Sequence, residues 1–207
     1  MRAWQVAVLA RAPVPGQAKT RLIPRLGAER AAALQAHLTE RALQRARDAG
    51  GTVVLWFAGP VDAGTAELAR HHGAELRSQP DGDLGARMLA AAWHAHRASM
   101  VSIIIGTDCP TQRAADLLQA RALLEDCDVV LQPALDGGYV LIGMNCPHPE
   151  VFSDIAWGSD SVLESTRRRC FELDLRVAEL AALPDLDRPE DLERAFTAGA
   201  LERRQWS

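Results

Sequence analysis

Two hydrophobic patterns alternate along the chain. Short runs of consecutive apolar, β-branched residues, such as VSIII at 101–105, are typical of strands buried on both faces of a sheet. Between these runs, apolar residues recur at helical spacing, as do Leu34, Leu38 and Ala42. The runs predict strands over residues 6–10, 52–58, 74–78, 101–105, 129–132, 139–144 and 176–179. The helical spacing predicts helices over residues 28–49, 63–72, 83–97, 114–125, 159–173 and 190–198, the fifth capped by Ser159 or Asp160.

The order of these elements indicates the fold class. Strands that alternate with helices predict a mostly parallel sheet with helices on both faces. The turn at residues 136–138 is too short to join parallel neighbours, so it predicts an antiparallel part and a mixed α/β sheet. The chain has 207 residues and no repeat, low-complexity stretch or linker. It is therefore expected to form one domain over residues 1–207.

Composition narrows the class of protein. The chain is 48% hydrophobic and 24% charged, as ordinary globular proteins are, and its formal charge of -4 argues against a general nucleic-acid binder. No apolar run approaches the length of a membrane span, so no membrane partner is expected. The four cysteines form no CxxC pair, which favours a reduced, cytoplasmic protein over a disulfide framework or a zinc site.

The strand at 101–105 ends abruptly in Gly-Thr-Asp-Cys-Pro, because Pro110 cannot continue a strand ladder. The break brings Asp108 to the carboxyl end of a central strand, where ligands bind in open α/β sheets. A hard cation held by one or two carboxylates and by substrate phosphates needs such a placement. Alternatively, Asp108 caps the helix that follows. The strand end by itself leaves both roles open.

The loop after the first strand contains a group of cations. It offers Arg11, Lys19, Thr20 and Arg21 but only one glycine, Gly16, so it is neither a Walker loop nor a dinucleotide fingerprint. Side-chain cations can neutralise a diphosphate where backbone amides do not. The alternative is a solvated basic helix start, which would oppose the helix dipole. Lys19 is also the only lysine beside 22 arginines, which is expected where a compact ammonium is required; the alternative is chance, and a single residue leaves both open.

The loop before the last helix contains two carboxylates, Asp185 and Asp187. Since this loop leaves a short strand, it can face the same crevice as Asp108. Paired with Asp108, it would provide a Mg²⁺ or Mn²⁺ site of one or two carboxylates. The alternative is structural, because Asp187-Arg188-Pro189-Glu190 resembles a helix N-cap with proline in the first turn.

The stretch Asp136-Gly137-Gly138-Tyr139 combines a carboxylate, a permissive backbone and the only tyrosine. In a functional loop, Asp136 would bind the acceptor or act as a general base. In a plain hairpin turn it needs no ligand, although such a turn does not require the second glycine. Trp157 is either an aromatic wall beside a sugar or base, or a core or rim aromatic.

Six motifs occur in a fixed order: APVPGQAKTRL, GDLGARM, GTDCP, DGGY, WGSDSVLEST and DLDRPEDL. Together they resemble a bacterial family of small glycosyltransferase A-type proteins in the nucleotide-diphospho-sugar transferase superfamily. Some relatives in that family are assigned to arsenosugar biosynthesis. The AKTRL element is also similar to that of 2-phospholactate guanylyltransferases, which share the fold and transfer a nucleotide.

The resemblance implies a Rossmann-like mixed sheet and a set of site residues. Asp108 stands where related enzymes hold their metal through Asp-x-Asp, here reduced to Thr-Asp-Cys, and Asp187 is the expected second ligand. The resemblance further implies that the nucleotide base is lined by Gln79, Gly82 and Gly85, and that the diphosphate is held by Arg11, Lys19 and Arg21.

The function expected from these residues and this resemblance is a cytoplasmic, Mg²⁺- or Mn²⁺-dependent glycosyltransferase. It would move a sugar from a nucleotide-diphospho-sugar to a small acceptor, with Lys19 and Asp136 as catalytic residues and Asp136 as the base of an inverting reaction. The sugar and acceptor would lie against Gly137, Gly138, Tyr139 and Trp157. Two alternatives are a guanylyltransferase-like enzyme that releases pyrophosphate and a non-catalytic nucleotide-binding protein.

Overall fold

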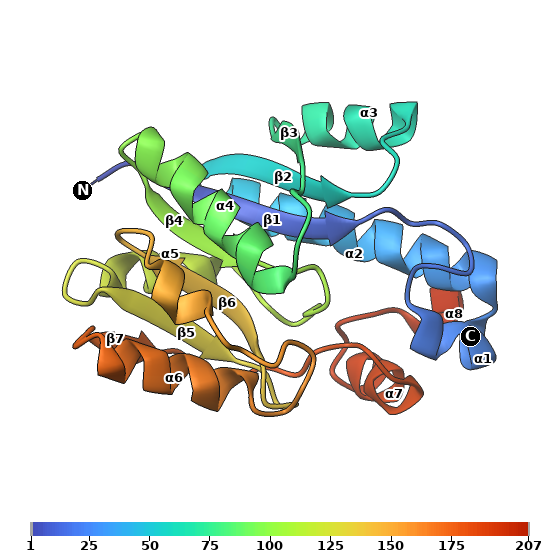
Figure 1. Ribbon diagram of the computed structural model, residues 1–207. Helices are drawn as coiled ribbons and strands as arrows, with labels where there is room; N and C mark the ends of the chain where they lie inside the picture. The colour runs from blue at the N-terminus through green and yellow to red at the C-terminus, as the bar shows by residue number, and fades with distance from the viewer. Residues whose placement is uncertain (1, 207) are drawn as a thin grey trace.

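The computed structural model describes residues 2–206. Within that range the chain is built on a seven-stranded sheet in the order β3-β2-β1-β4-β6-β5-β7 (Figure 1). The strands are β1 (Trp4–Arg11), β2 (Thr52–Ala58), β3 (Glu75–Ser78), β4 (Val101–Ile105), β5 (Val129–Pro133), β6 (Tyr139–Met144) and β7 (Val177–Glu179). The named strands pair in parallel except β6, which runs antiparallel to both β4 and β5. The predicted mixed, mostly parallel sheet is confirmed.

Helices occupy the connections between the strands. The longer ones are α2 (Ala28–Asp48), α3 (Ala63–His71), α4 (Leu84–Arg97), α5 (Ala114–Leu123), α6 (Val162–Glu172) and α7 (Pro189–Thr197). The short ones, which the sequence pattern did not predict, are η1 (Thr20–Leu22), α1 (Ile23–Leu26), η2 (Pro149–Phe152) and α8 (Arg203–Trp206). The predicted long helices are confirmed, and the largest error at a helix start is at α6, predicted from 159 and observed from 162.

The predicted cap of α6 is wrong. Ser161 is the N-cap, and neither Ser159 nor Asp160 has that position. Residues before the helix form a turn instead, in which the Ser159 amide donates to the Ala156 carbonyl at 3.2 Å. The Leu163 amide in the first turn of α6 donates to Gly137 O at 2.9 Å, so the β5–β6 hairpin satisfies a helix-start donor. This contact also seats the hairpin against the helix.

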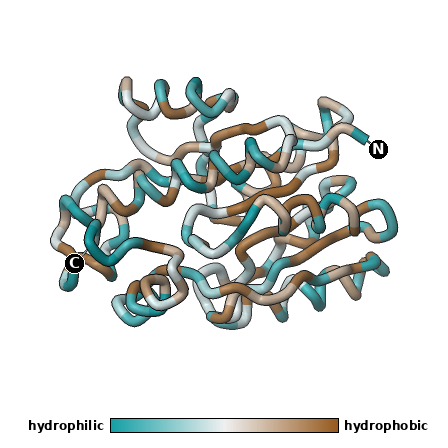
Figure 2. The backbone as a smooth tube through the Cα atoms, turned by 180° about the vertical axis from the view of Figure 1, so that it is seen from behind, coloured by the Kyte–Doolittle hydropathy of each residue, from teal (hydrophilic) through white to brown (hydrophobic). Residues whose placement is uncertain are grey.

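The alternating side chains of the strands fill two apolar layers. On one face, Val6, Val8 and neighbouring residues pack under α2 and α5; on the other, Ala7 and Ile104 pack under α4 and α6. Figure 1 shows α4 in front of the sheet and α2 behind it. Figure 2 shows hydrophobic residues concentrated along the central strands, with hydrophilic residues on the outer helices. Both faces are covered, as the continuous apolar runs predicted.

A third apolar cluster attaches the end of the chain to its beginning. Leu186 and Leu192 pack with Leu22 of η1 and with residues of α1 and α2 such as Leu26 and Leu34. Figure 1 accordingly shows α7 and α8 beside α1 and α2. This packing brings the loop before α7 close to the loop after β1. The two loops therefore meet at the carboxyl end of β4.

The cysteines and the helices bear on two further properties, disulfide bonding and membrane insertion. All four cysteines are free thiols, as predicted from their spacing. Among residues 2–206, no helix has both the length and the apolar character needed to cross a bilayer.

Candidate functional site

A cavity of about 610 Å³ lies at the carboxyl ends of β1 and β4. It is bounded by the loop after β1, the loop after β4, the β5–β6 hairpin, the start of α4 and the loop before α7. The sequence-predicted residues that line it are Arg11, Lys19, Thr20, Arg21, Gln79, Asp108, Asp136, Gly138, Tyr139, Trp157 and Asp187. Gly82, Gly85 and Gly137 are not among the lining residues. The cavity therefore collects side chains from most of the chain at the expected edge of the sheet.

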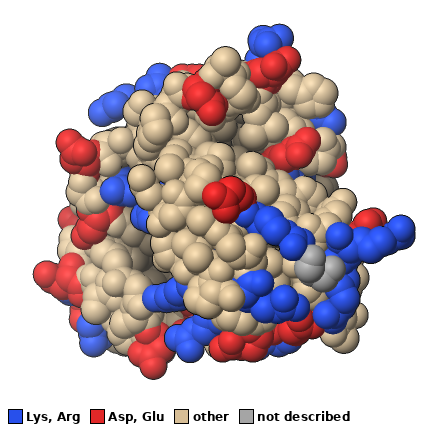
Figure 3. Space-filling view, turned by 90° about the vertical axis from the view of Figure 1, so that its right-hand side faces the viewer, with Lys and Arg blue, Asp and Glu red and all other residues tan. Residues whose placement is uncertain are grey.

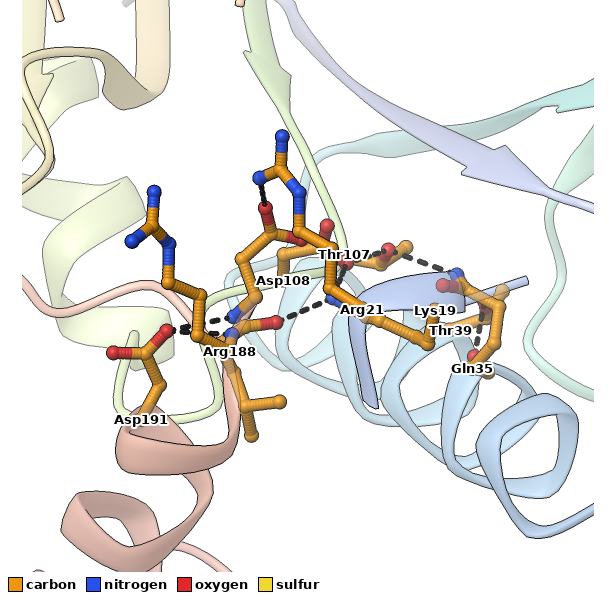
Figure 4. Close-up of polar contacts among 10 residues, drawn as sticks. Lys19, Arg21, Gln35, Thr39, Thr107, Asp108, Arg188 and Asp191 are labelled. Carbon is orange, nitrogen blue, oxygen red and sulfur yellow. Dashed lines mark hydrogen bonds and ion pairs between the residues drawn. The ribbon is translucent and has the colours of Figure 1, made fainter. Parts of the chain in front are cut away.

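Lys19 lies at the junction of three loops (Figure 4). Its Nζ is 2.9 Å from Asp108 Oδ1 and donates to Leu186 O at 2.5 Å. The side chain is only 3% exposed, so the ammonium is shielded from solvent. Lys19 has a φ of 48°, in the left-handed region, just before η1. The lone lysine is an internal cation that joins the loops after β1, after β4 and before α7.

Asp108 is oriented through one of its two oxygens. Thr107 Oγ1 donates to Asp108 Oδ1 at 2.9 Å, and Gln35 Nε2 on α2 donates to Thr107 Oγ1 at 3.1 Å (Figure 4). The Asp108 side chain remains 47% exposed, which leaves it open toward the cavity. The alternative that Asp108 caps α5 is wrong, since α5 begins at Ala114 with Arg113 as its N-cap.

Asp187 forms an ion pair with Arg21. The alternative that Asp187 caps α7 is wrong, because the N-cap is Arg188. Asp191 serves the helix start instead: its carboxylate accepts from the Arg188 amide at 2.7 Å and from the Asp187 amide at 3.1 Å. Asp187 therefore keeps its side chain for Arg21 and the cavity. The Asp187 side chain is 37% exposed and the Arg21 side chain 62% exposed, so solvent weakens this ion pair.

Two more carboxylates line the same side of the cavity. Asp136 Oδ1 accepts from the Gly138 amide at 3.0 Å, which fixes the carboxylate at the hairpin turn. Burial, followed by the negative charge of nearby Asp136, raises the pKa of Asp185 to about 6. Gly137 is essential to the turn, because its φ is +92° and a Cβ there would lie 2.0 Å from Asp160 O.

Gln79 lines the cavity, but its amide is engaged inside the protein. Nε2 donates to Ala10 O at 3.0 Å and to Trp56 O at 2.9 Å, which are carbonyls of β1 and β2. Its Oε1 accepts from Arg87 Nη1 at 3.3 Å. Both amide protons are therefore used, and Gln79 has no free donor for a nucleotide base.

The two glycines that the resemblance assigned to the base pocket act in the backbone. Gly82 has a φ of +115°, and Gly85 lies in the first turn of α4. A Cβ at Gly85 would lie 2.7 Å from Trp157 Cζ2, so this glycine lets the helix pack against the indole. Gly85 thus positions Trp157, which lines the cavity.

Tyr139 lines the cavity but points its hydroxyl into the core. Its Oη lies 4.0 Å from Met88 Sδ, and burial raises the pKa of this phenol. Among the polar lining residues, those without a role in the sequence prediction are Gln17, Gln35, Arg87, Thr107 and Ser159; Asp185, named there only beside Asp187, also lines the cavity. Arg87 occurs in the GDLGARM motif, three residues after Leu84, which also lines the cavity. Residues three apart on a helix share a face, so this spacing could have indicated that Arg87 points toward the cavity.

A divalent cation fits this donor set in one mode only. Among residues 2–206, no three His, Cys, Asp or Glu side chains form a metal cage. Asp108 and Asp187 both line the cavity; Asp108 uses Oδ1 for Lys19 and Thr107 while staying half exposed, and Asp187 pairs with Arg21. Mg²⁺ is commonly held by one or two carboxylates together with waters and substrate phosphates. The two aspartates suit that mode and not a cage made by the protein alone.

The surface beside the cavity has mixed charge. Figure 3 shows basic and acidic side chains interspersed over the face that includes the C-terminal helices, without a broad patch of one sign. The salt bridges of α7 and α8 with their neighbours, such as Arg203–Glu193 and Arg25–Glu193, account for part of this mixing.

Comparison with known proteins identifies the family. The family described as "Uncharacterized protein conserved in bacteria (DUF2064)" matches residues 33–159, more than half of the chain, so the chain belongs to this family. No curated protein sequence matches it significantly.

Solved structures show the fold. A candidate nucleotide-diphospho-sugar transferase from Desulfovibrio desulfuricans G20 is 27% identical, with a TM-score of 0.87 over 100% of this chain and 92% of that chain. CMP:2-keto-3-deoxy-manno-octonic acid synthetase complexed with CTP is 15% identical, with a TM-score of 0.52 over 96% of this chain and 100% of that chain. Rv0371C from Mycobacterium tuberculosis H37Rv, complexed with manganese, is 18% identical, with a TM-score of 0.55 over 95% and 100%. The chain has the predicted fold of the nucleotide-diphospho-sugar transferase superfamily.

Proposed function

We propose that this member of the DUF2064 family is a transferase that moves a sugar from a nucleotide-diphospho-sugar to a small acceptor. Residues 1–207 would act as one domain, with donor and acceptor meeting in the cavity at the ends of β1 and β4. The likeness in fold to a candidate nucleotide-diphospho-sugar transferase over the whole chain supports a nucleotide-activated donor. The six motifs that resemble glycosyltransferase A-type proteins support sugar transfer.

The proposal rests on how charge is divided across the cavity. Arg11 ends β1, and Arg87 lies on α4, which packs on β1 and β4. Carboxylates begin at the end of β4 and continue across the hairpin and the loop after β7; they are Asp108, Asp136, Asp185 and Asp187. The β1 side is therefore suited to an anionic diphosphate. On the opposite side, Asp136 and Asp185 are suited to an acceptor that donates a hydrogen bond, such as a hydroxyl, and would repel a phosphorylated acid. Asp108 and Asp187 lie where the two sides meet, because they pair with Lys19 and Arg21 of the loop after β1.

The chemistry follows from this division. The bond between the sugar's anomeric carbon and the diphosphate oxygen breaks, and a bond from that carbon to the acceptor oxygen forms. Negative charge that develops on the departing diphosphate is stabilised by the cations of the β1 side. Asp136, held at the hairpin turn by the Gly138 amide, would take the acceptor proton. A Mg²⁺ or Mn²⁺ ion, held by Asp108 and Asp187, would supply further neutralisation of the leaving group.

The experiment is a ligand panel followed by product analysis. Nucleotide sugars and nucleoside triphosphates are compared by thermal shift with and without Mn²⁺. A donor at 100 times its Kd stabilises the fold by about 2.7 kcal/mol, a rise in Tm of roughly 5–11 °C. The expected result is a shift with one nucleotide sugar, followed by release of a nucleoside diphosphate when the acceptor is added.

Other results of the same experiment would replace the proposal. Release of pyrophosphate from a nucleoside triphosphate would identify a nucleotidyltransferase. Binding without turnover of any donor would identify a nucleotide-binding protein. A chain that binds none of the panel would refute a nucleotide-activated donor.

A further inference from the structure

The cations of the cavity are not equally free. Lys19 and Arg21 are each paired with an aspartate, Asp108 and Asp187. Neither of the remaining cavity cations, Arg11 and Arg87, lies within ion-pair distance of a carboxylate anywhere in residues 2–206. Two of the three cations that the sequence assigned to the diphosphate are thus already neutralised by the chain. The uncompensated positive charge lies at Arg11 and at a residue that the sequence analysis did not assign.

Arg87 is held in place by a built hydrogen-bond relay. The two amide protons of Gln79 go to Ala10 O and Trp56 O, which fixes the plane of the amide. Oε1 is thereby turned to accept from Arg87 Nη1 at 3.3 Å. The ends of β1 and β2 therefore determine where the guanidinium points. The Gln79 side chain and two backbone carbonyls are thus used to orient Arg87, and none of these bonds is part of an ion pair.

The guanidinium is also incompletely satisfied. Arg87 is half-buried, and its Nε is shielded from solvent without an acceptor within the described residues. A buried donor without a partner is unfavourable, and more so when the group is charged. Arg87 lines the cavity, and phosphate oxygens suit the remaining N–H groups of its guanidinium, because this planar group presents paired donors that match an anion's oxygens.

From these contacts we propose that Arg87 is an anion-binding residue of the cavity, positioned by Gln79, and that with Arg11 it holds the diphosphate of the donor. The assignment rests on the proposed function only in naming the donor's diphosphate as the anion. Lys19 then organises the loops around Asp108, and the contact with phosphate passes to the two arginines. The loop after β1 has a single glycine, so its backbone cannot approach a phosphate as closely as a glycine-rich loop does, which favours contact through side chains.

The test measures binding of inorganic pyrophosphate and of four nucleoside diphosphates by calorimetry, at one Mg²⁺ concentration. Arg87→Gln should weaken both pyrophosphate and the bound nucleoside diphosphate by at least about tenfold, since it removes a charge-assisted contact. Arg87→Lys should recover part of the loss, because charge returns without the planar fork. Arg168→Gln is the matched control, because Arg168 is 61% exposed on α6, where it pairs with Glu172. It should bind as the wild type does.

The positioning role of Gln79 is tested by a double-mutant comparison. Gln79→Leu should weaken pyrophosphate binding in the wild type and cause no further loss in Arg87→Gln. A purely structural role would instead lower Tm and affinity equally in both backgrounds.

The outcomes separate this assignment from the proposed function. Wild-type affinity in Arg87→Gln would overturn the assignment and leave the function untouched. Binding of pyrophosphate but of no nucleotide, with loss in Arg87→Gln, would support the anion site and refute the nucleotide donor. A wild-type chain that binds neither pyrophosphate nor nucleotides would overturn both.

Discussion

Replacement of Lys19 by methionine should destabilise the fold far more than replacement of the neighbouring cation Arg21. The methionine keeps the length of the side chain and removes the ammonium that joins Asp108 Oδ1, at 2.9 Å, to Leu186 O, at 2.5 Å. Hydrogen bonds from charged groups contribute about 1.5–3 kcal/mol each. Asp108 is 47% exposed and can regain water, so its share is smaller. The expected loss is about 3 kcal/mol.

The assay is urea and thermal unfolding of the two methionine variants beside the wild type. For a chain of this size, a loss of about 3 kcal/mol lowers Tm by roughly 6–12 °C. Arg21→Met removes an exposed ion pair with Asp187, which is worth about 1 kcal/mol or less. If Lys19→Met unfolds no earlier than Arg21→Met, the ammonium does not hold the loops together.

A double-mutant cycle locates the energy. Asp108→Asn should cost stability in the wild type and much less in Lys19→Met, with a coupling of about 1–2 kcal/mol. Additive losses would mean that Lys19 acts through Leu186 O alone. Lys19→Arg should also destabilise the protein, since a larger guanidinium must enter a site that is 3% exposed.

Three further predictions concern the hairpin, a buried histidine and the proposed base. Gly137→Ala should lower the free energy of unfolding in urea by more than about 3 kcal/mol, because its Cβ would meet Asp160 O at 2.0 Å. Gly16→Ala is the control: Gly16 also has a positive φ but faces open space, so the loss should be about 1 kcal/mol. Burial lowers the pKa of His72 below 6.5, so the unfolded chain binds its proton first and stability falls as pH drops below about 6.5; His72→Leu should reduce this loss between pH 7.5 and 5.5. Asp136→Asn should lower kcat about 10²- to 10⁴-fold with unchanged donor binding, and an unchanged kcat would exclude it as the base.

The sequence by itself determined the elements and the edge of the sheet where chemistry is possible. Strand runs and helical spacing are local properties, so strands such as β2 and β6 were predicted to the residue. The short turn at 136–138 correctly implied an antiparallel strand, since a parallel partner needs a longer crossover. The ends of β1 and β4 placed Arg11 and Asp108 at one crevice. Cap positions were predicted less well. The N-caps of α5 and α7 are Arg113 and Arg188, whose amides donate to Asp116 and Asp191 in the first turn, and at α6 Ser161 takes the position expected of Ser159 or Asp160.

Tertiary structure decided which of these side chains are free. Packing of α7 and α8 on α1 and α2 closes the loop of Asp187 onto Arg21, although the two residues are 166 positions apart. The same closure buries the ammonium of Lys19 between Asp108 and Leu186 O. No local pattern contains such a pairing, since it depends on how distant apolar surfaces pack. The sequence shows which residues carry charge. Only the fold determines that Lys19 and Arg21 are paired with aspartates. Arg11 and Arg87 have no carboxylate partner among residues 2–206.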